Sequence, residues 1–119
     1  MTDKTELAKR AVACKGWRWM PGMCNQHDDR ILCASSDRVQ DDEGLWKSAA
    51  GLLPSLDDPA TLGCLEHLVR EACGWNCVAA HDEDEGWVVY EVIASCHWPV
   101  RGAGNTRAEA LIDALEAAP

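Results

Sequence analysis

Phenylalanine is absent from this chain of 119 residues, which carries six tryptophans and one tyrosine instead. Also absent is any apolar run near the roughly 20 residues that a membrane-spanning helix requires. Residues 1–6, Met-Thr-Asp-Lys-Thr-Glu, lack the basic and apolar regions of a signal peptide. These absences predict a cytoplasmic protein with no membrane partner.

Basic side chains are few, because eleven lysines and arginines stand against twenty aspartates and glutamates, which gives a net charge of −9. Proteins bind a phosphate backbone through basic side chains that release counterions, so we expect no direct contact with nucleic acid. Anionic membrane surfaces are disfavoured for the same reason. The acids gather in three runs, at residues 41–43, 57–58 and 82–85. Such runs are typical of solvated loops, and they also suit a docking face for a basic partner surface.

Motifs of catalysis are missing as well. The chain has no Gly-x-Ser-x-Gly elbow and no phosphate-binding loop. Gly102-x-Gly104 lacks the third glycine of a dinucleotide-binding motif and the strand-to-helix context that such a motif needs. Most acids lie in solvated runs, where nothing shifts a pKa toward acid–base work. We therefore expect no enzyme, no catalytic residue and no cofactor.

Seven cysteines are present, an odd number with no export signal beside it. This pattern argues against a full disulfide framework and predicts free thiols. A free cysteine behaves as a small apolar side chain. Cys33, Cys77 and Cys96 lie among apolar neighbours in the sequence, so we expect them to be buried.

Metal-binding residue types occur, but their spacing is poor. Cys24-x-x-His27 and Cys64-x-x-His67 are equally spaced pairs, yet 36 residues separate them and Cys-x-x-Cys is missing. The acidic stretch 81–86 lacks the ligand register of an EF-hand loop. We expect no metal, and a zinc-stabilised regulatory module stays open as an alternative.

Three segments are predicted as helices. Residues 6–15 repeat apolar side chains at helical spacing and end near Gly16. Residues 59–73 follow an acidic N-cap with proline at the first helical position, and Gly74 closes the helix. The last helix opens at Thr106 with a capping box, Thr-Arg-Ala-Glu.

Strands are predicted at residues 17–20, 30–34, 76–80 and 87–94, with 35–44 as a loop and 45–54 ambiguous. The acidic link that ends in Gly86 is typical of a hairpin connection. Helices on both sides of a small antiparallel meander indicate one α+β domain over residues 1–119. We expect a sheet of three to four strands packed with three helices in a sandwich-like arrangement.

Three stretches of the chain resemble small uncharacterised phage and prophage proteins. They are residues 7–23, with Gly-Trp-Arg-Trp-Met-Pro-Gly-Met, residues 53–72, with Leu-Pro-Ser-Leu-Asp-Asp-Pro, and residues 104–115, with Gly-Asn-Thr-Arg-Ala-Glu-Ala-Leu. The chain is similar in them to the family described as the phage ABA sandwich domain, a sheet held between helices. The resemblance implies the fold and a viral origin, and it transfers no catalytic residue.

Two functions follow as expectations. The first is a non-enzymatic phage protein in the host cytosol. Its acidic loops would imitate phosphate and occupy a basic surface on a host complex. That complex would handle nucleic acid or provide defence, as a CRISPR effector does. Its candidate contacts are Asp41, Asp42, Glu43, Asp82, Glu83, Asp84 and Glu85. The alternative is a structural or accessory phage protein that forms a small homo-oligomer.

Overall fold

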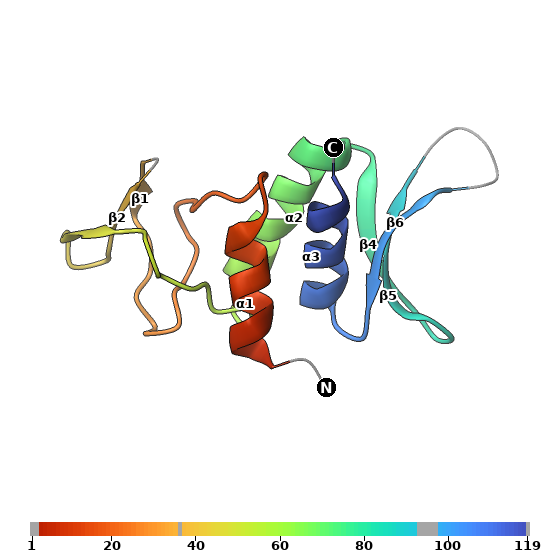
Figure 1. The fold of residues 1–119 in the computed structure, drawn as a ribbon, viewed down its shortest axis with the longest axis horizontal. Helices are drawn as coiled ribbons and strands as arrows, with labels where there is room; N and C mark the ends of the chain where they lie inside the picture. Colours follow the sequence, from red (N-terminus) through yellow and green to blue (C-terminus); the bar gives the residue numbers. More distant parts are fainter. Residues whose placement is uncertain (1–2, 36, 93–97, 119) are drawn as a thin grey trace.

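The computed structural model describes residues 3–35, 37–92 and 98–118, and in them a layer of helices lies between two small sheets (Figure 1). The helices are α1 (Lys4–Ala13), α2 (Pro59–Cys73) and α3 (Arg107–Ala117). The first sheet holds β1 (Cys33–Ala34), β2 (Arg38–Gln40) and β3 (Trp46–Ser48), and the second holds β4 (Cys77–Asp82), β5 (Gly86–Glu91) and β6 (Val100–Gly104). All neighbouring strands are antiparallel. The predicted α+β class with antiparallel strands and three helices is confirmed, but the strands form two sheets of three rather than the one sheet of three to four that was expected.

The starts of α2 and α3 follow their predicted capping signals. The Asp58 carboxylate accepts a hydrogen bond from the Thr61 N–H at 2.9 Å. At α3, the Thr106 hydroxyl oxygen accepts from the Glu109 N–H at 3.1 Å, and Glu109 in turn accepts from the Asn105 N–H at 2.9 Å. Each bond satisfies a backbone amide that has no partner inside the helix.

The first helix starts and ends two residues earlier than the predicted range 6–15. Asp3 is its N-cap, because the Asp3 carboxylate accepts a hydrogen bond from the Thr5 N–H at 3.2 Å. At the other end, Cys14 already has extended backbone angles. The cap, rather than the apolar repeat, therefore sets the first turn.

Three predictions in the first half of the chain are wrong. Residues 17–20 form no strand, the predicted strand 30–34 is reduced to β1 at its end, and the expected loop 35–44 contains β2. Two or three residues are too few to show a period of alternation, so pairing between strands decides where these elements lie.

The predicted hairpin is present as β4 and β5, joined by the loop 83–85 and by Gly86 in the left-handed region at φ 82°. A three-residue loop closed by such a glycine is a common hairpin connection. The third strand, β6, was not predicted. A Cβ on Gly102 would lie 2.5 Å from the Ala110 carbonyl oxygen, and a Cβ on Gly104 would lie 2.4 Å from Cβ of Glu109. These two glycines therefore allow α3 to pack directly against β6.

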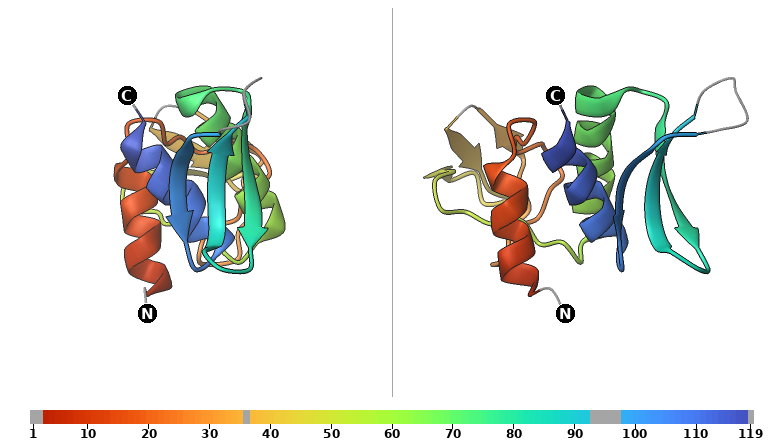
Figure 2. Two further views of the ribbon diagram at one scale, coloured as in Figure 1. Left: turned by 90° about the vertical axis from the view of Figure 1, so that its right-hand side faces the viewer. Right: turned by 45° about the vertical axis from the view of Figure 1, so that its right-hand side comes forward.

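The helices cover one face of the second sheet, and no described residue forms a layer over its other face (Figure 2). The main core lies between the helices and this covered face, with Leu65, Val69 and Val89 among its buried side chains. A second core lies toward the first sheet and includes Val39 of β2 and Leu68 of α2. Helix α2 thus contributes to both cores. The helical layer is held between sheets, whereas the resemblance implies a sheet held between helices.

The cysteines fit the expectation of burial only in part. Cys77 is buried, Cys33 is exposed on the short strand β1, and Cys96 lies outside the described residues. All six described cysteines are free thiols. The prediction for Cys33 was wrong because strand side chains alternate between faces, and Cys33 is on the solvent face. None of the described helices has the length and apolar character to cross a membrane.

Candidate functional site

The loop between β4 and β5 presents three of the predicted contact residues to solvent. Asp82 shapes this loop, because its carboxylate accepts hydrogen bonds from the N–H groups of Asp84 at 2.8 Å and Glu85 at 3.1 Å. Glu83, Asp84 and Glu85 are exposed, and no ion pair within the described residues involves them. We call these three carboxylates the acidic tip. It is the densest unpaired charge in the described part of the chain.

Asp41 is not a surface contact, which corrects one predicted site residue. Its side chain is only 4% exposed and forms an ion pair with Lys47 at 3.1 Å. The carboxylate also accepts hydrogen bonds from the N–H groups of Leu45 at 2.9 Å and Glu43 at 3.0 Å. These backbone bonds, and then Lys47, lower the pKa of Asp41. Its role is to hold the turn between β2 and β3 and leave Asp42 exposed beside it.

The two predicted acidic groups do not share a surface. Asp42 and Glu43 belong to the first sheet and the acidic tip belongs to the second. These sheets form opposite ends of a molecule that measures 49 × 29 × 20 Å (Figure 1). One flat partner surface therefore contacts one end or the other.

Most of the basic side chains form ion pairs with carboxylates at the protein surface. Nine of the eleven lysines and arginines form ion pairs with nine different carboxylates. Eleven of the twenty acids then have no lysine or arginine within ion-pair distance. Only two basic residues, Lys15 and Arg38, form no ion pair with a described carboxylate. The net charge of −9 thus resides in carboxylates outside these ion pairs, of which Asp3, Asp82, Glu109 and Asp113 accept backbone hydrogen bonds.

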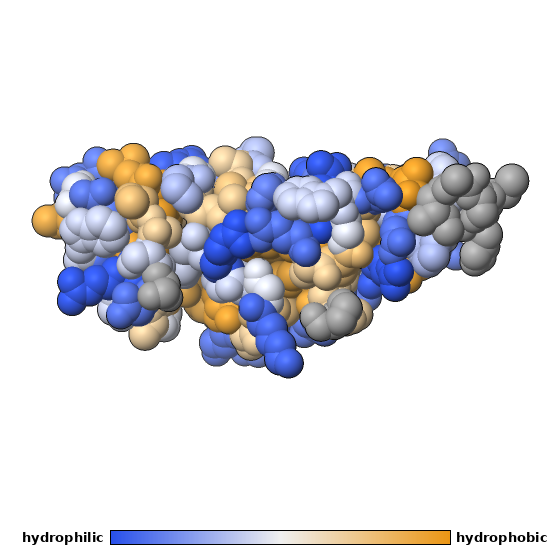
Figure 3. Space-filling view, turned by 90° about the horizontal axis from the view of Figure 1, so that it is seen from above, coloured by the Kyte–Doolittle hydropathy of each residue, from blue (hydrophilic) through white to orange (hydrophobic). Residues whose placement is uncertain are grey.

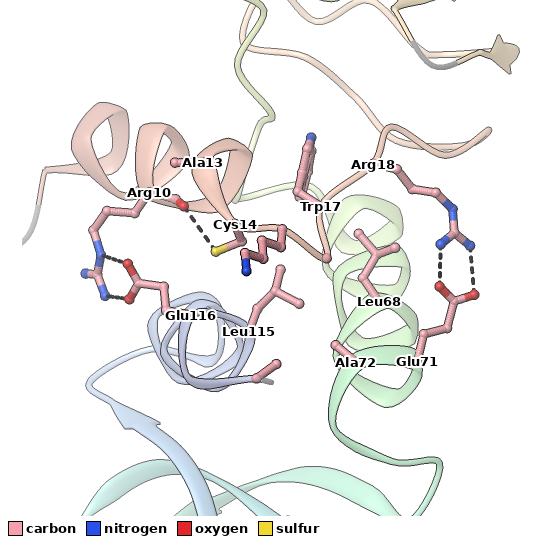
Figure 4. A pocket seen from close by; sticks show the side chains of 13 residues that line it. Arg10, Ala13, Cys14, Trp17, Arg18, Leu68, Glu71, Ala72, Leu115 and Glu116 are labelled. Carbon is pink, nitrogen blue, oxygen red and sulfur yellow. Dashed lines mark hydrogen bonds and ion pairs between the residues drawn. The ribbon is translucent and has the colours of Figure 1, made fainter.

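A cavity of about 880 Å³ lies between the ends of the three helices (Figure 4). Its apolar floor includes Leu68, Ala72 and Leu115. An ion pair flanks it on each side: Arg10 binds Glu116 through two hydrogen bonds, of 2.5 and 3.1 Å, and Arg18 binds both carboxylate oxygens of Glu71. In Figure 4 the two pairs face each other across the floor.

Titratable groups that line this cavity have shifted pKa values. The hydrogen bond from Arg18 lowers the pKa of Glu71 to about 2, so the carboxylate has no proton to give. Burial raises the pKa of the Cys14 thiol, which donates to the Arg10 carbonyl oxygen at 3.2 Å. A protonated thiol is a poor nucleophile. His67 is paired with Glu71 at 3.1 Å, on the outer side of α2.

A second groove, also of about 880 Å³, lies between α1 and the first sheet. Trp17 and Trp19 line it and meet edge to face, with ring centroids 5.5 Å apart. The Trp17 indole N–H is buried without a hydrogen-bond partner in the described residues. Its ring points away from Leu115 and Ala72 in Figure 4. Sequence reasoning gave no signal for either cavity, because both form between segments that are distant in the chain.

The potential metal ligands are not brought together in the part of the chain that the structure describes. No group of three or more histidine, cysteine, aspartate or glutamate side chains there has the geometry to hold a metal ion. Cys24 is buried, and its thiol donates to the Asn25 carbonyl oxygen, while His27 is exposed. Cys96 and His97 lie outside the described residues.

Comparisons with family models, with curated proteins and with solved structures found no match to this chain.

Proposed function

We propose that this protein is a non-enzymatic acidic binding protein that occupies a basic surface of a partner protein or complex. The observation that carries the proposal is the division of charge. Nine of the eleven lysines and arginines form ion pairs with carboxylates of the same chain, while eleven carboxylates form no such pair. Among these carboxylates, those of the acidic tip are the furthest in sequence from any lysine or arginine.

Such a surface favours a partner of opposite charge through long-range attraction. Complementary potentials raise the rate of encounter and lose their effect as salt screens them. Surfaces that bind nucleic acid are rich in lysine and arginine because they must neutralise phosphates. A cluster of carboxylates presents the same sign of charge to them. The proposed partner is therefore a protein that handles nucleic acid, and the chain itself touches no nucleic acid.

The resemblance to phage proteins narrows the proposal to the host cytoplasm. There the partner is a host complex that handles nucleic acid or provides defence, and a CRISPR effector is one example. The cavity between the helices supports binding over catalysis, because its carboxylates are held ionised by arginines and its thiol is held protonated.

The experiment immobilises the intact protein and two matched triple variants and exposes each to a nuclease-treated bacterial lysate at low salt. One variant neutralises the acidic tip (Glu83→Gln, Asp84→Asn, Glu85→Gln). The control neutralises three exposed acids near the first sheet (Asp28→Asn, Asp42→Asn, Glu43→Gln) and has the same net charge. We expect the wild type to retain nucleic-acid-binding proteins that duplex DNA displaces, the tip variant to lose them, and the control to keep them.

Retention that DNA does not displace, or that both variants keep equally, contradicts the proposal. If only the control variant fails to retain these proteins, the contact lies near the first sheet, which contradicts the role of the acidic tip.

A structural phage protein that forms a small homo-oligomer is the second candidate. The uncovered face of the second sheet favours it, because symmetric assemblies commonly bury such a face against a second copy (Figure 2). Sedimentation separates the two candidates, since one chain has a mass of 13.0 kDa. A monomer at micromolar concentration supports the acidic binding protein, and a stable dimer supports the alternative.

A further inference from the structure

The uncovered face of the second sheet has an apolar composition. Side chains alternate between the faces of a strand, and Gly102 and Gly104 face α3. The strand register therefore assigns seven side chains to the opposite face: Val78, Ala80, Asp82, Val88, Tyr90, Val100 and Ala103. We call the six uncharged residues the open face. Asp82 lies at its border beside the acidic tip.

This composition is unusual for a face in contact with water. Antiparallel sheets with one solvated face normally place polar side chains on it. Here Val100 is 54% exposed, and Ala80 and Ala103 are also exposed, whereas Val88 at the centre of the face is buried. Trp98, 45% exposed, lies edge-on to Tyr90 with ring centroids 6.5 Å apart. Figure 3, seen from above, shows both apolar and hydrophilic side chains next to the grey residues at this end of the molecule. An aromatic pair next to exposed valine is the type of surface that anchors protein interfaces.

Each edge strand of the same sheet has a backbone group that is hydrogen-bonded to a helix side chain. At β4, the Arg70 guanidinium donates to the Cys77 carbonyl oxygen at 3.0 Å. At β6, the Ala103 N–H donates to the Asp113 carboxylate at 3.0 Å. These bonds disfavour the addition of a further strand at either edge. A partner therefore packs onto the open face rather than extending the sheet.

The charge at the end of this face identifies its occupant. The acidic tip directly continues β4 and β5, so the apolar surface ends in three carboxylates that form no ion pair with another described residue. A second copy would add a second charge of −9 to the assembly. We infer that the open face and the acidic tip form one docking surface for a partner protein that presents apolar side chains beside clustered lysines or arginines. This inference rests on the proposed function and adds the apolar half of its interface.

The test uses three synthetic peptides of equal length, which alternate lysine with leucine, lysine with serine, and glutamate with leucine. Titrations followed by amide NMR shifts report both affinity and location. We expect the lysine–leucine peptide to bind about tenfold more tightly than the lysine–serine peptide, because about 55 Å² of added apolar burial corresponds to that factor. Its shifts should fall on β4, β5 and β6 and spare the first sheet. The glutamate–leucine peptide should not bind.

Two single variants with the same change of charge separate the halves of the interface. Val100→Lys places a cation on the open face, and Leu45→Lys places one in the turn before β3, where the Leu45 side chain is 58% exposed. We expect Val100→Lys to remove the advantage of the lysine–leucine peptide and leave the affinity for the lysine–serine peptide within about twofold. Leu45→Lys should change neither. Both sites are exposed, so folding is preserved.

The outcomes are distinguishable from failure of the proposed function. Unchanged leucine preference in Val100→Lys overturns the open-face inference even if the tip variant loses its basic partners. If the glutamate–leucine peptide binds as tightly as the lysine–leucine peptide, the acidic tip has no role in docking and the inference is overturned. A wild type that sediments at twice 13.0 kDa, with Val100→Lys as a monomer, assigns the face to a second copy and also overturns the inference.

Discussion

Asp113 of α3 accepts a hydrogen bond from the backbone N–H of Ala103 in β6, at 3.0 Å. The helix thus supplies the acceptor that a neighbouring strand would otherwise supply, and it places a negative charge at the edge of the sheet. This contact and the two glycines of β6 together define how closely α3 packs against the second sheet.

Asp113→Ala should lower the free energy of unfolding by about 1 kcal/mol, the usual net contribution of one hydrogen bond. Amide exchange at Ala103 should accelerate at the same time. Urea denaturation and NMR exchange measure the two effects. Asp84→Ala is the control, because its carboxylate is exposed and outside the ion pairs described above. Unchanged exchange at Ala103 would show that the contact does not protect the edge.

Gly102→Ala should destabilise the protein by about 1–3 kcal/mol, because the new methyl group overlaps the backbone of α3. Gly63→Ala is the matched control, since Gly63 lies within α2 with open space around its Cβ position. The control should stabilise by about 0.5–1 kcal/mol, because alanine loses less backbone entropy in a helix. Thermal unfolding of both variants tests the pair. Equal effects would contradict the close strand–helix contact.

The pKa of Glu71 should rise from about 2 toward the ordinary value of about 4.3 in the variant Arg18→Gln. The folded-state pKa lies below the unfolded one, so this carboxylate stabilises the fold at neutral pH. That contribution declines as pH falls from about 4.3 through the folded value. The variant should therefore lose less stability than the wild type over this acid range. An NMR titration of the glutamate carboxyl carbons checks the shift, and an unchanged pKa refutes the assignment to Arg18.

Leu68→Ala should cost about 2–5 kcal/mol, because Leu68 is fully buried in the second core. Helix α2 also carries Leu65 and Val69 in the main core, so both ends should unfold in one transition. Urea curves followed by tryptophan fluorescence and by far-ultraviolet circular dichroism should coincide. Leu45→Ala, at an exposed position, should change stability by less than about 0.5 kcal/mol.

The helices were accessible from the sequence because their signals are local. Asp58 with Pro59 marks the start of α2, and Thr106 with Glu109 marks the start of α3. The β4–β5 hairpin was equally accessible, since β-branched and aromatic residues flank an acidic loop that ends in glycine. In each case a few neighbouring residues contain the whole signal.

The missed elements depend on contacts between distant residues. Gly102 and Gly104 look like a fragment of a nucleotide-binding motif, and only the approach of α3 reveals them as strand positions. The predicted contact Asp41 is buried, because Lys47 and the turn to β3 enclose it. The acidic tip was identified correctly as exposed charge, but its place at the end of an apolar face required the register of β6.

The separation of the two sheets by a helical layer has a practical consequence for labelling. A fluorophore attached through the exposed thiol of Cys33 would lie at the end of the molecule away from the open face. It would report the rotational diffusion of the whole protein without obstructing a partner protein bound at the open face. Fluorescence anisotropy of such a conjugate can therefore follow complex formation in solution without a tag on the partner.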